Sequence, residues 1–295
     1  MTNEIVKQEQ EEQGAIQQEP KKQTIQQLMN SAAVLKKISD VFGSEKKASS
    51  FISSVISVAQ NNKLLRNAEP MSILSSAMVA ATLDLPVVPT LGMAYLVPYN
   101  RVCSFQIGYK GILELAMRSG EFRKIIDEVV YKGQLKKKNK FTGEYEFDED
   151  AIELDEKGQP TPIGVMARFD LINGYSKTIF WSADEILAHA KRFSQAFRSG
   201  YDSPWKSDYW QMARKTVLKS LLNKYAPKSV AMESAFKFDQ AKVVANTTDV
   251  DALDIDAFDV EYVDNPESGA APVDEQKAKE VEEKFKDFGK EEKDS

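Results

Sequence analysis

The chain has 295 residues, enough for one large domain or two modest ones, and its 42% hydrophobic residues suffice for a packed core. A single cysteine, Cys103, excludes an internal disulfide, and with the single histidine, His189, it leaves too few soft ligands for a structural zinc site. No apolar run reaches the ~18–20 residues of a membrane span, and the Gln- and Glu-rich N-terminus is unlike a secretory signal, so we expect a cytoplasmic protein.

The formal net charge of −6 is unevenly distributed along the chain. Residues 247–295 carry 17 acidic and 6 basic side chains, whereas residues 188–242 carry 11 basic and 4 acidic ones. A basic body favours a polyanionic partner, and an acidic tail favours a protein partner or shielding of the body itself.

The N-terminal part of the sequence predicts helices. Residues 1–23 have few large apolar groups, so we expect a disordered arm. Thr24 and Gln27 form a potential capping box that opens a helix ending at Gly43. Two further helices are predicted over residues 44–59 and 71–83, with Pro70 at the first turn of the second.

The middle of the chain predicts antiparallel strands. Short apolar runs bounded by turn residues predict strands at 93–98, 102–107, 122–132, 163–172 and 175–181. The Asn173-Gly174 dipeptide between the last two is typical of a tight hairpin. A helix is expected from Gly108–Gly111 to Gly120, and a Lys-rich segment at 136–140 precedes an acidic return strand.

The C-terminal part returns to helices. Ser182 and Glu185 form a second capping box, which opens a helix through Phe197. Helices at 205–225 and 230–238 follow, then an acidic linker over 245–275 and a marginal helix at 275–288. The sequence therefore predicts an α+β fold in which helices flank a small antiparallel sheet. We expect a disordered arm at 1–23, a DNA-binding, oligomerising core at 24–244, and a flexible acidic partner-binding tail at 245–295.

Enzymatic chemistry has little support in the sequence. The P-loop, G-x-G-x-x-G and G-x-S-x-G motifs are absent. His189 is one potential general base, but its position on a helix beside Lys191 and Arg192 is more typical of a packing or surface residue. The acidic residues between 148 and 156 are compatible with a divalent-metal nuclease, but they are more typical of a solvated hairpin arm paired to the Lys-rich segment.

The 188–242 segment predicts a phosphate-binding surface. Gln211, Lys215 and Lys219 recur at helical spacing and share one face, which places cations in a line along a rigid element. Aromatic residues suited to stacking on bases are Tyr109, Phe197 and Trp210. The alternative is a solvated basic face with the aromatic side chains in the core.

Three stretches favour the phosphate-binding interpretation. They are LPVVPTLGMAYLVPY at 85–99, FQIGYKG at 105–111, and SPW followed by YWQMARKTVLK at 203–219. In order and spacing they resemble the RecT family of phage single-strand annealing proteins, over roughly residues 28–238. The family is distantly related to Red-beta.

The resemblance implies ATP-independent annealing of complementary DNA strands by a homo-oligomer that forms rings or helical filaments. No cofactor is required, and a divalent cation is expected to assist only non-specifically. The implied partners are single-stranded DNA, the annealed duplex, a 5′–3′ exonuclease and the host single-stranded DNA-binding protein, all in the cytoplasm of a bacterial cell. A passive single-strand binder is the remaining alternative.

The resemblance also assigns residues to DNA binding. Its first motif contains Gln106, Tyr109 and Lys110, and its second contains Gln211, Lys215 and Thr216. We predict phosphate contacts from Lys110, Arg214 and Lys215, in a continuous basic trough lined by Lys191, Arg192, Arg198 and Lys206. Arg101 is a weaker candidate at a hairpin tip. Gly108 and Gly111 either admit the DNA backbone or start a helix with unusual dihedrals.

Overall fold

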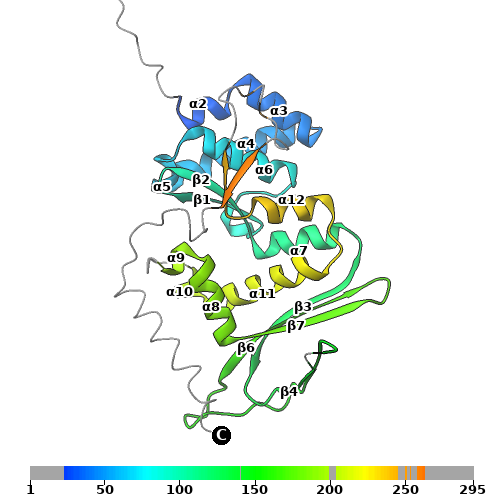
Figure 1. The fold of residues 1–295 in the computed structure, drawn as a ribbon. Coiled ribbons are helices and arrows are strands. Elements are labelled where there is room, and N and C mark those ends of the chain that lie inside the picture. The colour runs from blue at the N-terminus through cyan, green and yellow to red at the C-terminus, as the bar shows by residue number, and fades with distance from the viewer. Residues whose placement is uncertain are drawn as a thin grey trace, which may run out of the picture.

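The computed structural model describes residues 23–139, 141–198, 204–244, 250, 253 and 258–262 (Figure 1). Within these residues the strands form antiparallel sheets of four, three and two strands, and helices flank them. The predicted α+β class is confirmed. Residues 1–22 of the predicted arm at 1–23, most of the acidic tail and the predicted helix at 275–288 lie outside the described residues.

The N-terminal helices form one end of the molecule (Figure 1). The capping box of Thr24 and Gln27 is confirmed, but the helix that it opens is interrupted after Met29. Ser31 accepts a hydrogen bond from the Val34 backbone and starts a second helix, which ends at Gly43 in the left-handed conformation. The helices are α2 (Ile25–Met29), α3 (Ala32–Phe42), α4 (Glu45–Asn61), α5 (Lys63–Arg66) and α6 (Pro70–Thr82).

Helix α6 is the buried centre of this end, and it supports the four-stranded sheet. Ser72 accepts a hydrogen bond from the Cys103 backbone nitrogen, and Ser76 donates one to the Cys103 oxygen. The sheet has the order β1 (Ala94–Tyr99), β2 (Val102–Ile107), β8 (Ala241–Val244) and β9 (Asp259–Tyr262). The short 3-10 helix η1 (Pro89–Leu91) precedes it, and the predicted β1–β2 hairpin is confirmed with its turn at Asn100-Arg101.

Part of the predicted tail belongs to the core. Strand β9 pairs with β8, and both Leu253 and Phe258 are buried among the core residues. The Lys37 ammonium also donates a hydrogen bond to the Val250 carbonyl, 3.1 Å away. The core therefore continues beyond the predicted boundary at residue 244, because two apolar side chains of the acidic segment find a place in it.

The second sheet has the order β3 (Phe122–Tyr131), β6 (Pro162–Leu171) and β7 (Ser176–Ser182). The hairpin at Asn173-Gly174 is confirmed. Strands β4 (Leu135–Asn139) and β5 (Glu144–Phe147) form a separate hairpin that pairs the Lys-rich segment with the acidic return strand, and Lys136 makes an ion pair with Asp148 at 3.9 Å. No group of three or more His, Cys, Asp or Glu side chains within the described ranges is placed to hold a metal ion.

The remaining helices connect the two sheets (Figure 1). Helix α11 contacts all three strands of the second sheet, and α7 and α12 lie between α11 and the four-stranded sheet. The predicted helix at 205–225 is divided at Asp208, whose backbone is not helical. The helices are α7 (Tyr109–Arg118), α8 (Ala183–Phe193), α9 (Gln195–Arg198), α10 (Pro204–Ser207), α11 (Tyr209–Tyr225) and α12 (Val230–Phe238). Among the described residues, no helix is long and apolar enough to cross a membrane.

Two C-terminal truncations test the extent of the core. Deleting residues 247–295 removes the buried Leu253 and Phe258, and losses of such side chains typically cost about 2–5 kcal/mol each. Deleting residues 263–295 retains both. We expect thermal unfolding to show a clearly lower midpoint for the longer deletion and a midpoint near that of the full chain for the shorter one. Equal midpoints for the two truncations would contradict this assignment.

Candidate nucleic-acid interface

Helix α11 carries the second predicted motif and is fixed by its buried face. Ala213, Val217 and Leu221 pack into the core, so the intervening polar side chains must leave the helix on other sides. The capping box of Ser182 and Glu185 is confirmed at the start of α8, which packs against α11 and ends at Phe193, four residues before the predicted end. The polar side chains of α11 meet two buried aspartates, one from each sheet region.

Asp127 of β3 joins α11 to α7. Its side chain is 2% exposed and accepts from the Arg214 Nε at 2.7 Å and from the Tyr109 hydroxyl at 2.5 Å. The Arg214 Nη2 also donates to the Asp127 carbonyl at 2.8 Å. Burial, followed by the bond to Asp127, raises the pKa of Tyr109 and keeps it a neutral donor. Through Asp127, Tyr109 and Arg214 therefore connect α7 and α11 to β3.

Asp239, which follows α12, joins α11 to β2. One carboxylate oxygen accepts from the Ile107 backbone nitrogen at 3.0 Å, and the other accepts from the Lys219 ammonium. The next residue, Gln240, has a φ of 63° and donates its backbone N–H to the Phe105 carbonyl at 3.0 Å. The chain thus turns sharply at Gln240, between α12 and β8, and this turn places Asp239 between the two predicted motifs.

The two motifs are therefore brought together, although by residues that the sequence analysis did not identify. Ile125, Asp127 and Val129 lie at every second position of β3 and share its inward face. A single carboxylate on this apolar face could have indicated a buried, paired aspartate. For Asp239 there was no comparable signal, because its role depends on the unusual conformation of Gln240.

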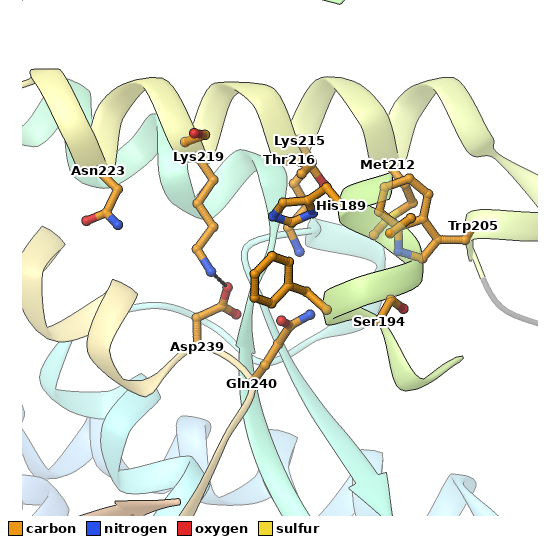
Figure 2. A pocket seen from close by; sticks show the side chains of 13 residues that line it. His189, Ser194, Trp205, Met212, Lys215, Thr216, Lys219, Asn223, Asp239 and Gln240 are labelled. Carbon is orange, nitrogen blue, oxygen red and sulfur yellow. Dashed lines mark hydrogen bonds and ion pairs between the residues drawn. The ribbon is translucent and has the colours of Figure 1, made fainter. Parts of the chain in front are cut away.

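A pocket of about 260 Å³ lies between α8, α11 and the Asp239-Gln240 turn (Figure 2). Lys219 extends across it from α11 to Asp239 (Figure 2). The lining combines apolar side chains with hydrogen-bonding groups: His189, Phe193, Ser194, Trp205, Met212, Lys215, Thr216, Lys219, Ser220, Asn223, Asp239 and Gln240, together with Ala190. Such a mixture suits an anionic ligand with an apolar portion.

His189 forms part of the wall of this pocket. Its ring packs between Trp181 and Phe193, with centroid distances of 5.3 and 4.6 Å. Burial, then the charges of Lys219 and Arg192, lowers the pKa of His189 to about 4, so the imidazole is neutral at pH 7. Its buried Nδ1 has no hydrogen-bond partner among the described residues.

Lys215 is the second lysine of α11 that lines this pocket. It is half-buried, and among the described residues it makes no ion pair, in contrast to Lys219 one turn further along α11. Burial lowers the pKa of Lys215; the charge of Asp239 opposes this shift and that of Lys219 adds to it. An anion that enters the pocket would supply the missing counter-charge.

The other predicted residues lie on several elements, and of these only Thr216 lines the pocket. Lys110 is exposed at the first turn of α7 and lies over Gly92, and no ion pair holds it within the described chain. Gln106 donates to the Tyr99 hydroxyl at 3.1 Å. Thr216 lines the pocket with Lys215, whereas Gln211 and Arg101 are exposed, the latter in the β1–β2 turn.

The predicted groove residues near α8 have mixed roles. The Arg198 Nη1 donates to the Arg192 carbonyl at 2.6 Å and the Lys191 carbonyl at 3.3 Å, so it caps the C-terminus of α8. The Arg192 guanidinium lies over the Phe193 ring, and Lys206 is exposed on α10. None of these side chains is among those that line the pocket, and the continuous trough that they and Lys110 would form stays a prediction.

Two expectations are corrected by packing. Phe197 is 5% exposed and meets Trp205 edge-to-face at 6.1 Å, so it is a core residue and is not placed to stack on bases. A Cβ on Gly108 would lie 2.0 Å from the Gly92 carbonyl oxygen, and one on Gly111 would lie 2.1 Å from that of Met93. These glycines admit the protein's own backbone rather than that of DNA.

Comparison with known proteins identifies the family. The model of the RecT family matches residues 49–252, which include the 105–111 and 209–219 motifs. The chain belongs to the RecT family. Membership of this family indicates binding of single-stranded DNA and annealing in recombination.

Two relatives illustrate this similarity. The chain is 41% identical over 212 residues to the uncharacterized protein YqaK of Bacillus subtilis (strain 168), covering 72% of this chain and 70% of the relative. It is 27% identical over 214 residues to protein RecT of Escherichia coli (strain K12), covering 69% of this chain and 74% of the relative. The resemblance inferred from the three sequence stretches is thus confirmed.

Proposed function

We propose that this RecT-family chain anneals complementary single strands of DNA without ATP, as a homo-oligomer that holds the sugar-phosphate backbone beside α11. The observation that carries the proposal is Lys215, a half-buried lysine that lines a pocket and makes no ion pair among the described residues. A backbone phosphate is the anion that would complete this pocket.

The energetics of annealing fit a protein of this kind. Stacking in the product duplex provides about 1.4 kcal/mol per base-pair step, so the protein needs to align the strands and reduce their repulsion rather than supply energy. Any sequence must be annealed, so contacts should go to phosphates and leave the base edges free to pair. Protomers arranged side by side would combine weak individual contacts into tight binding.

The proposed partners follow from the reaction. A 5′–3′ exonuclease would generate the single strands, and the host single-stranded DNA-binding protein would cover them before annealing. We place the reaction in the cytoplasm of a phage-infected bacterium. No cofactor is proposed, and a divalent cation would act only by general screening of the phosphates.

The test is annealing of two complementary fluorescent oligonucleotides by the purified full chain without nucleotide, with and without magnesium. We expect duplex to form faster than in the protein-free reaction, with both strands intact on a denaturing gel. Shortened strands in magnesium would instead support a nuclease. Binding without acceleration would support a passive single-strand binder. Electron microscopy after sequential addition of the two strands tests the predicted oligomer.

A further inference from the structure

Asp239 is the acidic residue of the pocket, and it pairs with one of the two lysines that line it. Its carboxylate is buried, and its two oxygens are taken by the Ile107 backbone N–H and the Lys219 ammonium. Lys215 and Lys219 are separated by four residues on α11, so they share a helix face, and both line the pocket. Yet only Lys219 has the carboxylate as a direct partner, whereas Lys215 senses its charge without pairing.

The position of Asp239 is imposed by the backbone rather than by its attraction to Lys219 alone. Gln240 adopts a left-handed φ of 63°, which is uncommon for a residue with a side chain and costs about 1 kcal/mol or more. Its N–H bond to the Phe105 carbonyl and the bond from Ile107 to Asp239 fix this turn to β2 on both sides. The carboxylate is therefore held in place even before Lys219 reaches it.

We propose that Asp239 is a positioning residue that keeps Lys219 away from nucleic acid, so that the pocket binds one backbone phosphate, through Lys215. This inference rests on the proposed function. A phosphate that approached Lys219 would have to displace a buried carboxylate that its bond from Ile107 holds in place, whereas a phosphate at Lys215 would displace no ion-pair partner. Asp239 thereby limits the number of phosphates that the pocket neutralises in each protomer.

Limiting the number of contacts has a consequence for annealing. On single strands each neutralised phosphate contributes about 0.7 to the slope of log K against log salt, which corresponds to roughly fivefold in affinity between 1 M and 0.1 M salt. A second contact in every protomer would hold a strand more tightly through the whole oligomer. By pairing with Lys219, the Asp239 carboxylate prevents this second contact. Each strand is then bound weakly enough to be released into the duplex.

The test is the Asp239→Asn variant of the full chain, in which the amide oxygen can still accept from Ile107 while Lys219 loses its counter-charge. Binding of a fluorescent single-stranded oligonucleotide is measured by anisotropy over a series of salt concentrations. We expect tighter binding and a salt slope steeper by about 0.7 per bound protomer. The double variant Asp239→Asn/Lys219→Gln should return the slope to the wild-type value.

The control removes the same charge elsewhere. Asp84 is exposed after α6, and its φ of 50° suits asparagine, so Asp84→Asn changes the net charge equally without touching the pocket. We expect no change of slope in this control. An equal increase in both variants, an unchanged slope in folded Asp239→Asn, or a steeper slope that persists in the double variant would each overturn the proposal.

Two further outcomes are separated by additional variants. If Asp239→Asn does not melt cooperatively, Asp239→Ser repeats the charge removal with a hydroxyl that can accept from Ile107. If neither variant folds, Asp239 is required for the fold and the proposal is overturned. The Lys215→Ala variant tests phosphate binding itself, because its salt slope should fall below that of the wild-type chain. An unchanged slope in Lys215→Ala would contradict the proposed function, whereas an unchanged slope in Asp239→Asn alone would contradict only the role of Asp239.

Discussion

Replacing Lys215 with alanine should weaken binding to single-stranded oligonucleotides of unrelated sequence by a similar factor, and should reduce the salt slope by about 0.7 per bound protomer. Lys215 makes no ion pair among the described residues, so its replacement does not deprive a carboxylate of its counter-charge. We therefore expect thermal unfolding to change little while DNA binding and annealing fall together. Anisotropy titrations at several salt concentrations measure both the affinity and the slope.

The matched control for this variant is Lys224→Ala on the same helix. Lys224 is exposed, lies over the Tyr225 ring and does not line the pocket. The Lys224→Ala variant removes the same charge and should leave the salt slope near that of the wild-type chain. A sequence-dependent loss in Lys215→Ala would argue for base contact instead of phosphate contact, and an equal loss in both variants would reduce the role of the pocket to general electrostatics.

Local sequence signals predicted much of the fold. The capping boxes at Thr24 and Ser182 and the hairpin at Asn173-Gly174 are found where their local chemistry placed them. These features depend on hydrogen bonds and dihedral preferences within a few residues, which a sequence states directly. Helix ends were less accurate: Ser31 and Asp208 interrupt helices that apolar periodicity alone had continued.

The roles of individual cations could not be predicted in the same way. Arg214 and Lys215 are neighbours in one motif, but Arg214 pairs with a buried carboxylate 87 residues earlier while Lys215 faces a pocket. A motif shows that basic residues occur together; only the tertiary arrangement shows which of them already have a partner. The same limit applies to Lys219, whose partner follows another helix, and to the acidic segment whose Leu253 and Phe258 enter the core.

Because Arg214 pairs with the buried Asp127, we expect its main role to be stabilisation of the fold. The Asp127→Ala variant tests this role. The substitution leaves the Arg214 guanidinium and the Tyr109 hydroxyl without their buried acceptor. Breaking a buried ion pair from one side costs about 3–5 kcal/mol, and we expect the lower end because the 24% exposed Arg214 side chain regains some water. For a domain of this size about 3 kcal/mol corresponds to a fall of roughly 6–12 °C in the melting temperature.

The neighbouring residue provides the control for Asp127→Ala. Glu128 also lies near Arg214, at 3.7 Å, but its side chain is 65% exposed, so Glu128→Ala should cost less than about 1 kcal/mol. The double variant Asp127→Ala/Arg214→Met removes both charges and should recover much of the lost stability. Its salt slope then separates the two roles of the arginine: a wild-type slope identifies Arg214 as a brace between α11 and β3, whereas a slope reduced by about 0.7 shows that the same guanidinium also reaches a phosphate.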